Sequence, residues 1–261
     1  MFNNYRNFKY LIVGFLPLLS SCNKSNLLEK GGQWDQIRYG EYIIENNTWN
    51  IQLLKGKWSE IIFCDTIKGI MGWRWDFSNN YGNYKSNEVK TFPEIIFGKK
   101  PYNNYQSTTS KLPKKLSSAQ FRVKYEYIKN TNGIYNTSTD ISFCDSINPV
   151  EKNIRAKMMI WFDHQNFPFY KSEKLIIDNI GGLQYKVFID TTHVGPEGKW
   201  IFIALLSDRF PSKGELKLNE YFDYFITRGI LKPEWYLSSI EIGSEISSGK
   251  GEIIFKKYEI Y

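Results

Sequence analysis

The chain has 261 residues, of which 42% are hydrophobic and 17% aromatic, and its formal net charge is +7 at pH 7. Such a chain is long and apolar enough for one large domain with a sizeable core. The basic residues stand singly or in short pairs such as Lys99-Lys100. Nucleic-acid binding needs clustered basic residues, so we expect no nucleic-acid partner and interpret the charge as a solvated surface.

The first segment has the build of an export signal. Arg6 and Lys9 precede an apolar run, Leu11–Leu19, which at about ten residues is too short to span a bilayer as a helix. Leu19-Ser20-Ser21-Cys22 then matches the bacterial lipobox, whose Cys is acylated and becomes the mature N-terminus. We therefore expect a signal peptide at 1–21, acylated Cys22, and an exported lipoprotein anchored at the periplasmic face or the cell surface. Without Arg6 and Lys9 the mature charge is 32 − 27 = +5.

Residues 22–36 are mostly polar and are expected to form a tether, followed by one domain at 37–261. Short runs rich in aromatic and β-branched residues predict strands. They are Glu41–Glu45, Glu60–Cys64, Gln120–Ile128, Ala156–Phe162, Tyr185–Ile189 and Trp200–Leu206. Turn signals separate them at Asn79–Gly82, Asn130–Gly133, Gly181-Gly182 and Gly195–Gly198. This punctuation is typical of an all-β antiparallel sandwich or barrel.

One late segment predicts an α-helix. Leu218, Phe222, Phe225 and Ile226 fall on one face at a spacing of 3.6 residues. Asn219 is a plausible cap, and the helix is expected to stop at Gly229.

The remaining cysteines and the histidines predict no metal chemistry. Cys64 and Cys144 are free to pair in an oxidising compartment, and the sequence leaves that pairing open. They lack metal-ligand spacing, and His164 and His193 are isolated, which favours structural roles. We therefore expect neither a metal nor a cofactor.

Several motifs stand in a recognisable order along the chain. They are Tyr42–Trp49, Phe92–Gly98, Leu112-Pro113 with Gly133–Asn136 and Thr139–Ile141, Ala156–Phe162, and Leu231–Leu237 leading to Gly243-Ser244-Glu245. Together they resemble glycoside hydrolase family 12, the small endoglucanases, although Asn50 stands where the family has Gly. The resemblance implies a two-sheet β-jelly roll with one late helix. Its concave sheet would form an open cleft for β-1,4-linked glucan, and we expect a monomer.

The resemblance also assigns roles to residues. Glu245 matches the acid/base of the family, and Asp140 matches the residue that supports the nucleophile. The nucleophile position, fixed by the Met-Ile-Trp that follows it, holds Lys157. Substrate contacts are implied at Asn47, Trp49, Met159 and Trp161.

The alternation of β-strand side chains predicts which residues of this segment face the cleft. Lys157, Met159, Trp161 and Asp163 share one face, whereas Met158, Ile160 and Phe162 form an apolar face for the core. Elsewhere, Trp73 and Trp75 share a strand face, and either sugar stacking or core packing explains them.

Retaining hydrolysis needs two carboxyls, one as nucleophile and one as acid/base, and an ammonium cannot form the glycosyl ester. Lys157 would also favour the ionised forms of Asp140 and Glu245. The sequence therefore predicts a membrane-anchored β-glucan-binding protein with hydrolysis lost or crippled, so its status as an endo-β-1,4-glucanase is open. The alternative is an active retaining endo-β-1,4-glucanase that uses Asp140 or Asp163 instead. A third hypothesis is a structural or adhesion lipoprotein that kept the fold and changed its ligand.

Overall fold

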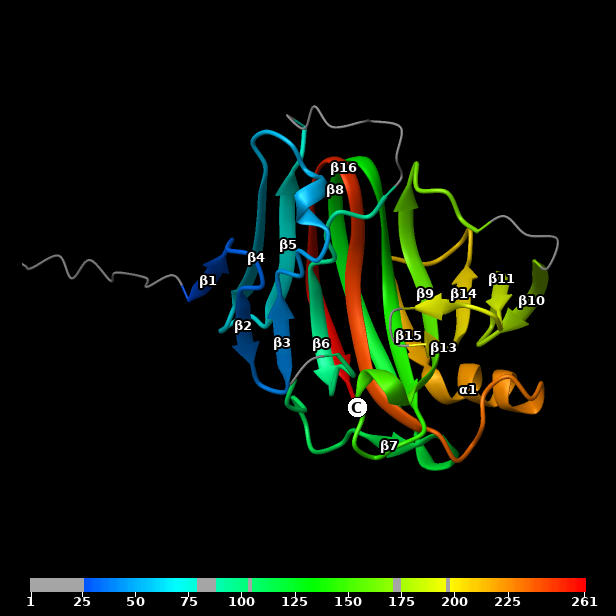
Figure 1. The fold of residues 1–261 in the computed structure, drawn as a ribbon. Coiled ribbons are helices and arrows are strands. Elements are labelled where there is room, and N and C mark those ends of the chain that lie inside the picture. The colour runs from blue at the N-terminus through cyan, green and yellow to red at the C-terminus, as the bar shows by residue number, and fades with distance from the viewer. Residues whose placement is uncertain (1–25, 79–87, 103–104, 171–174, 196–197) are drawn as a thin grey trace, which may run out of the picture.

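The computed structural model describes residues 26–78, 88–102, 105–170, 175–195 and 198–261, and its elements are almost all strands (Figure 1). The strands are β1 Leu27–Lys30, β2 Gln36–Tyr39, β3 Tyr42–Glu45, β4 Ser59–Asp65, β5 Ile70–Asp76, β6 Glu94–Gly98, β7 Lys114–Lys115, β8 Arg122–Cys144, β9 Ile154–Gln165, β10 Ile176–Ile180, β11 Leu183–Asp190, β12 Val194–Gly195, β13 Gly198–Lys199, β14 Ile201–Leu206, β15 Lys213–Lys217 and β16 Tyr236–Ile260. Three 3₁₀ turns cover Ile51–Leu53, Leu116–Ser118 and Glu151–Asn153. The predicted strands are all present.

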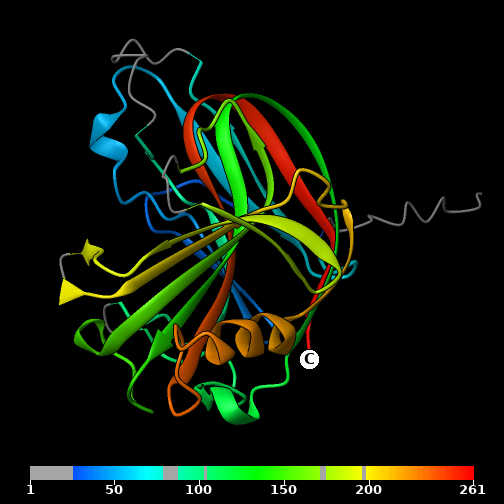
Figure 2. The ribbon, with the colours of Figure 1, turned by 90° about the vertical axis from the view of Figure 1, so that its right-hand side faces the viewer.

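Two sheets share the long strands β8 and β16, which run the length of the molecule in Figure 2. The C-terminal half of β16 pairs with β5 in the first sheet, ordered β1-β4-β5-β16-β8-β15. Its N-terminal half pairs with β6 in the second sheet, ordered β2-β3-β6-β16-β8-β9-β14-β11-β10. Within these two sheets the described pairings are antiparallel except that of β9 with β14. The predicted two-sheet jelly roll is confirmed.

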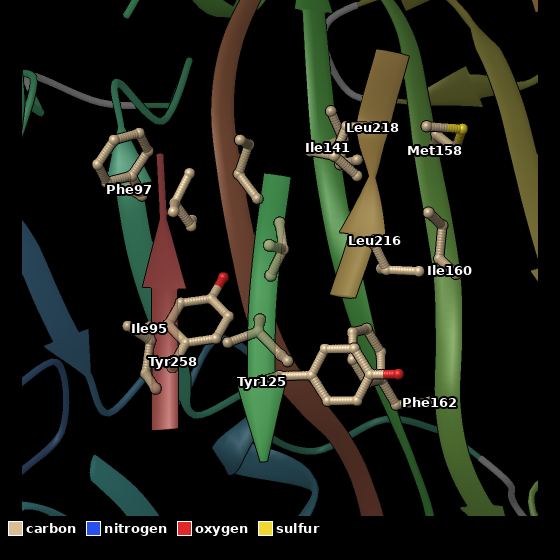
Figure 3. Close-up of a cluster of buried hydrophobic side chains, with 14 of the residues drawn as sticks. Ile95, Phe97, Tyr125, Ile141, Met158, Ile160, Phe162, Leu216, Leu218 and Tyr258 are labelled. Carbon is tan, nitrogen blue, oxygen red and sulfur yellow. The ribbon is translucent and has the colours of Figure 1, made fainter. Parts of the chain in front are cut away.

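The main core fills the space between the sheets. Met158, Ile160 and Phe162 of β9 point into it, as the alternation predicted, and are 0–2% exposed. Figure 3 shows them beside side chains from other elements, among them Tyr125 and Ile141 of β8. Phe162 packs edge-on against Tyr125, with ring centroids 4.7 Å apart. This packing fixes which face of β9 turns away from the core.

The turn predicted at Asn130–Gly133 is absent, because β8 continues through it. Gly133 pairs with Gly249 of β16, where a register shift interrupts the ladder and the two strands pass from one sheet to the other. A Cβ at Gly133 would lie 2.2 Å from the carbonyl oxygen of Ser248, and Gly249 has φ +82°. The glycines therefore permit a close backbone approach and a bend instead of a reversal.

Two other turn signals are resolved. Gly181 and Gly182 join β10 to β11 with positive φ values, as expected for a tight hairpin. Residues 194–195 pair with 198–199, and the two between lie outside the described residues. The signal at Asn79–Gly82 also lies outside them.

The late helix is confirmed as α1, Leu218–Thr227. Its cap is not Asn219: the helix begins at Leu218 after Lys217, with no side-chain cap. Gly229 follows the helix with φ +69°, in agreement with the predicted stop. Tyr221 and Phe225 bury the inner face of α1 in the main core.

The folded domain begins before the expected boundary between residues 36 and 37. β1 lies inside that stretch and pairs with β4, so the chain from Leu27 on belongs to the folded domain. Cys22 lies outside the described residues. Cys64 and Cys144 are both buried and free, so they do not form a disulfide. Among the described residues, no helix has the length and apolarity needed to cross a bilayer.

Candidate active site

The candidate site lies on the face of the second sheet that points away from the main core, here called the site face. On β9 this face carries Lys157, Met159 and Trp161, as predicted. Asp140 of β8 is directly opposite Met159, and Glu241 of β16 is directly opposite Asp140. Glu245 lies four residues further along β16, opposite Asn136. The structure therefore brings Lys157, Asp140 and Glu245 to one face.

Asp163 does not join them. A bulge in the ladder puts Ser138 opposite Trp161 but Thr137 opposite Asp163, which breaks the alternation after Trp161. The Asp163 carboxylate accepts a hydrogen bond from the hydroxyl of Tyr135, a core residue, and is 2.5 Å from Lys129 Nζ. The prediction that Asp163 shares the face of Lys157 is wrong, because the bulge turns it away.

Asp140 and Glu245 are held on the site face by short polar contacts. Ser138 Oγ donates to Asp140 Oδ1 at 2.7 Å, and Asn136 Nδ2 donates to Glu245 Oε2 at 2.5 Å. Burial, then the charge of Glu245, raises the pKa of Asp140 to about 7, although Lys157 lowers it. Burial also raises the pKa of Glu245 against the opposing effects of Asn136 and Lys157. Lys157 lowers the pKa of both carboxyls, as predicted, but burial raises these pKa values by more.

The ammonium of Lys157 lies under an aromatic ring. Its Nζ is 4.3 Å from the centroid of Tyr102 and 5.8 Å from a Trp200 ring. Burial opposes the charged form, but Tyr102, Glu241 and Asp140 together outweigh it and raise the pKa of Lys157. Lys157 is therefore a cation at neutral pH, and it cannot attack an anomeric carbon in that form.

Met159 and Trp161 belong to a second hydrophobic cluster on the site face, together with Phe202, Ala204 and Leu206. Trp161 is 0% exposed because Phe167, Phe169 and Tyr170 pack over it. Trp161 and Met159 thus offer no open surface to a sugar here, and they support the site from beneath. Among the described residues, Trp161 Nε1 has no hydrogen-bond partner.

Asn47 and Trp49 lie in the segment that follows β3. Asn47 Nδ2 donates to Glu94 Oε1 at 2.7 Å, whereas Trp49 is 52% exposed and available for stacking. Trp73 and Trp75, by contrast, are buried in the main core, and Trp73 Nε1 donates to Ser244 Oγ. The ambiguity over these two residues is resolved as core packing.

Several residues of this region escaped the sequence analysis. Tyr170 is close enough to Glu245 and Asp140 for their charges to raise its pKa further, after burial. Lys100, 6% exposed, contacts Glu94 and is 3.5 Å from Glu45 Oε1. Tyr102, Tyr170 and Lys100 have no local sequence signal, because their loops are brought here by tertiary structure. Glu241 had a local signal: it is four residues from Glu245 on one strand, so the two side chains point to the same face.

Elsewhere, a polar hollow of about 340 Å³ lies on the first sheet, lined by residues that include Arg74, Asp76 and Lys250. Its lining residues Asn132 and Lys250 lie on the same two strands as the site, four and five residues from Asn136 and Glu245. Arg74 of the hollow is already paired with Glu29 at 2.8 Å. Among the described residues, no group of three or more His, Cys, Asp or Glu is suited to hold a metal ion.

Comparisons with known proteins fit this arrangement. A sequence model of glycosyl hydrolase family 12 matches residues 40–260. Endoglucanase S of Pectobacterium parmentieri is 25% identical over 98% of this chain and 96% of its own. A xyloglucan-specific endo-beta-1,4-glucanase of Phytophthora nicotianae is 23% identical over 82% of this chain and 83% of its own.

Solved structures share the fold. A family 12 xyloglucanase from Bacillus licheniformis superposes with a TM-score of 0.78 at 24% identity, covering 89% of this chain and 98% of that one. An endoglucanase from Rhodothermus marinus gives 0.73 at 22% identity, covering 89% and 97%. With the family model spanning most of the sequence, the chain belongs to glycosyl hydrolase family 12.

Proposed function

We propose that this protein is a lipid-anchored member of the family that binds β-glucan chains along the site face and hydrolyses them weakly or not at all. The supporting observation is Lys157: the family motif assigns it to the nucleophile position, and its ammonium lies beneath Tyr102 among Asp140, Glu241 and Glu245. A retaining enzyme needs a second carboxylate about 5–5.5 Å from the first. The named activities of the relatives support the choice of β-glucan or xyloglucan as ligand.

Glu245 keeps the features of a proton donor, since burial raises its pKa. Asp140 remains as a candidate substitute nucleophile, because it lies on the site face while Asp163 does not. A partly buried carboxyl with a pKa of about 7 is largely protonated at pH 6, which weakens it as a nucleophile. The hypothesis of a glucan-binding protein therefore has better support than that of an active hydrolase.

The test is to incubate the purified protein with carboxymethyl cellulose, barley glucan and xyloglucan, and to measure binding and new reducing ends in parallel. We expect binding to at least one polymer with little or no product. Strong hydrolysis that survives in Lys157→Ala but disappears in Asp140→Ala would overturn the proposal and identify Asp140 as the substitute nucleophile. Retained hydrolysis in Asp163→Ala is expected in that case.

A further inference from the structure

Glu241 is a buried carboxylate of the site face to which the family motifs give no role. It is 3% exposed, lies directly opposite Asp140, and is four residues from Glu245 on β16. A carboxylate buried this deeply needs a compensating cation.

The strand register gives Lys157 a path to Glu241. Lys157 of β9 is opposite Ser142 of β8, which is opposite Ser239 of β16. Both serines are buried and small, so the long side chain of Lys157 meets no large side chain in that row. Ser239 Oγ donates to Glu241 Oε1 at 2.5 Å, which turns the Glu241 carboxylate along β16 toward the row of Lys157.

The charges agree with this geometry. Glu241 is among the groups that raise the pKa of Lys157, together with Tyr102 and Asp140. Glu241 also acts on Lys100: its charge raises the pKa of Lys100 more than that of Glu45 does, although Glu94 and Glu45 are the carboxylates within ion-pair distance. Five carboxyls thus surround two lysines in this region: Glu45, Glu94, Asp140, Glu241 and Glu245.

We propose that Lys157 and Glu241 form one charge unit, in which Glu241 positions the ammonium, and that hydrolysis requires both residues to change. Lys157→Glu alone would remove one of the two cations and add a carboxylate near Asp140 and Glu241. Neighbouring like charges raise the pKa of a carboxyl and keep it protonated, so Glu at position 157 would be a poor nucleophile. Glu241→Gln removes the excess charge while its amide oxygen still accepts the hydrogen bond from Ser239. The hydrolysis half of this inference rests on the proposed function.

The experiment compares the full-length wild type with Lys157→Glu, Glu241→Gln and the double variant. The matched control is Lys157→Glu combined with Glu60→Gln, because Glu60 is buried to a similar degree and accepts a hydrogen bond from Thr91, but is not among the charges that shift the pKa of Lys157 or Glu245. Reducing ends released from barley glucan and urea unfolding midpoints are measured for each protein. Circular dichroism establishes that each one folds.

Two results are expected. Glu241→Gln lowers the urea midpoint in the wild-type background, where Lys157 loses its counter-charge, and raises it in the Lys157→Glu background. The double variant hydrolyses at least about tenfold faster than Lys157→Glu, a difference of about 1.4 kcal/mol in barrier, whereas the Glu60→Gln control does not. If Lys157→Glu does not fold, Lys157→Met replaces it in the stability arm, where Glu241→Gln should then cost less than in wild type.

Either failure overturns the proposal: an effect of Glu241→Gln that is independent of residue 157, or a double variant no faster than the single one. The wild-type rate separately tests the proposed function. Vigorous hydrolysis by the wild type would refute that function, while the stability comparison would still decide whether Glu241 and Lys157 are paired.

Discussion

The ring of Tyr102 lies over the ammonium of Lys157, with Nζ 4.3 Å from the ring centroid. Tyr102 lies in the connection between β6 and β7, and Lys157 lies within β9, so one contact joins a connecting segment to the sheet. Lys157 is partly buried, and a cation held over a ring in this way is stabilised by about 1–2 kcal/mol.

This contact predicts an energetic coupling. Tyr102→Leu should lower the free energy of unfolding by about 1–2 kcal/mol in wild type and by clearly less when Lys157 is Met. Chemical denaturation of the two single variants and the double variant measures the coupling. Equal losses in both backgrounds would mean that the ring contributes only packing.

Glu60 predicts a pH dependence of stability. Burial raises its pKa to about 8, and the hydrogen bond from Thr91 offsets only part of the shift. The unfolded side chain titrates near 4.3, so between these values the folded state holds a proton that the unfolded state releases. The free energy of unfolding therefore falls as pH rises from about 4.3 to 8, by about 5 kcal/mol at most from this group. Asp140, with a pKa of about 7, contributes with the same sign.

Glu60→Gln keeps an acceptor for Thr91 and removes the titration. We expect the variant to be more stable than wild type at pH 8, with the gap closing toward pH 4.5. Urea unfolding at several pH values tests this, because Asp140 affects both proteins equally. A gap that does not change with pH would be inconsistent with a protonated Glu60 in the folded state.

Trp49 predicts a binding contact, since it is exposed two residues after Asn47, which is bonded to Glu94. Trp49→Ala should weaken glucan binding by roughly 1–3 kcal/mol, the effect of losing the burial of one large side chain. Isothermal titration with soluble glucans measures the loss. Ile67→Ala is the control, because Ile67 is 75% exposed on the turn between β4 and β5. Unchanged affinity in Trp49→Ala for every glucan that binds would show that Trp49 is no platform.

Cys22 predicts membrane association. Only Asn23–Asn26 separate it from β1, so an acyl chain on Cys22 would hold the domain within about 17 Å of the bilayer surface, at 3.3–3.6 Å per residue. Cys22→Ala should move the protein from the membrane to the soluble fraction, as immunoblots of fractionated cells would detect. An intact-mass measurement that finds an uncut, unlipidated chain would refute the prediction.

The sequence predicted what depends on periodicity and motif order. Met158, Ile160 and Phe162 alternate with Lys157, Met159 and Trp161 over enough residues to fix the face of each. It failed where backbone geometry overrides local composition. Asn130–Gly133 has turn residues, but in the fold Gly133 meets Gly249, and no local pattern announces a partner more than a hundred residues away.

The bulge after Trp161 has the same origin, because it depends on how β9 meets β8 and not on β9 alone. The candidate site residues likewise divide into those that motifs predict and those that only the fold brings to the site. Asp140 and Glu245 were found through motifs, whereas Tyr102 and Tyr170 reach the site through loops whose course only the fold determines.

The passage of β8 and β16 through both sheets has a consequence for folding. Their ladder joins Cys144 to Tyr236 at one end and Val123 to Ile260 at the other, so its partners are 92 to 137 residues apart in the chain. Neither sheet can form its central pair without most of the polypeptide already being present. Contacts of such high contact order form slowly, and the loop-closure entropy is lost before they stabilise anything. The ladder therefore makes the domain a single cooperative unit, whose two sheets are gained and lost together.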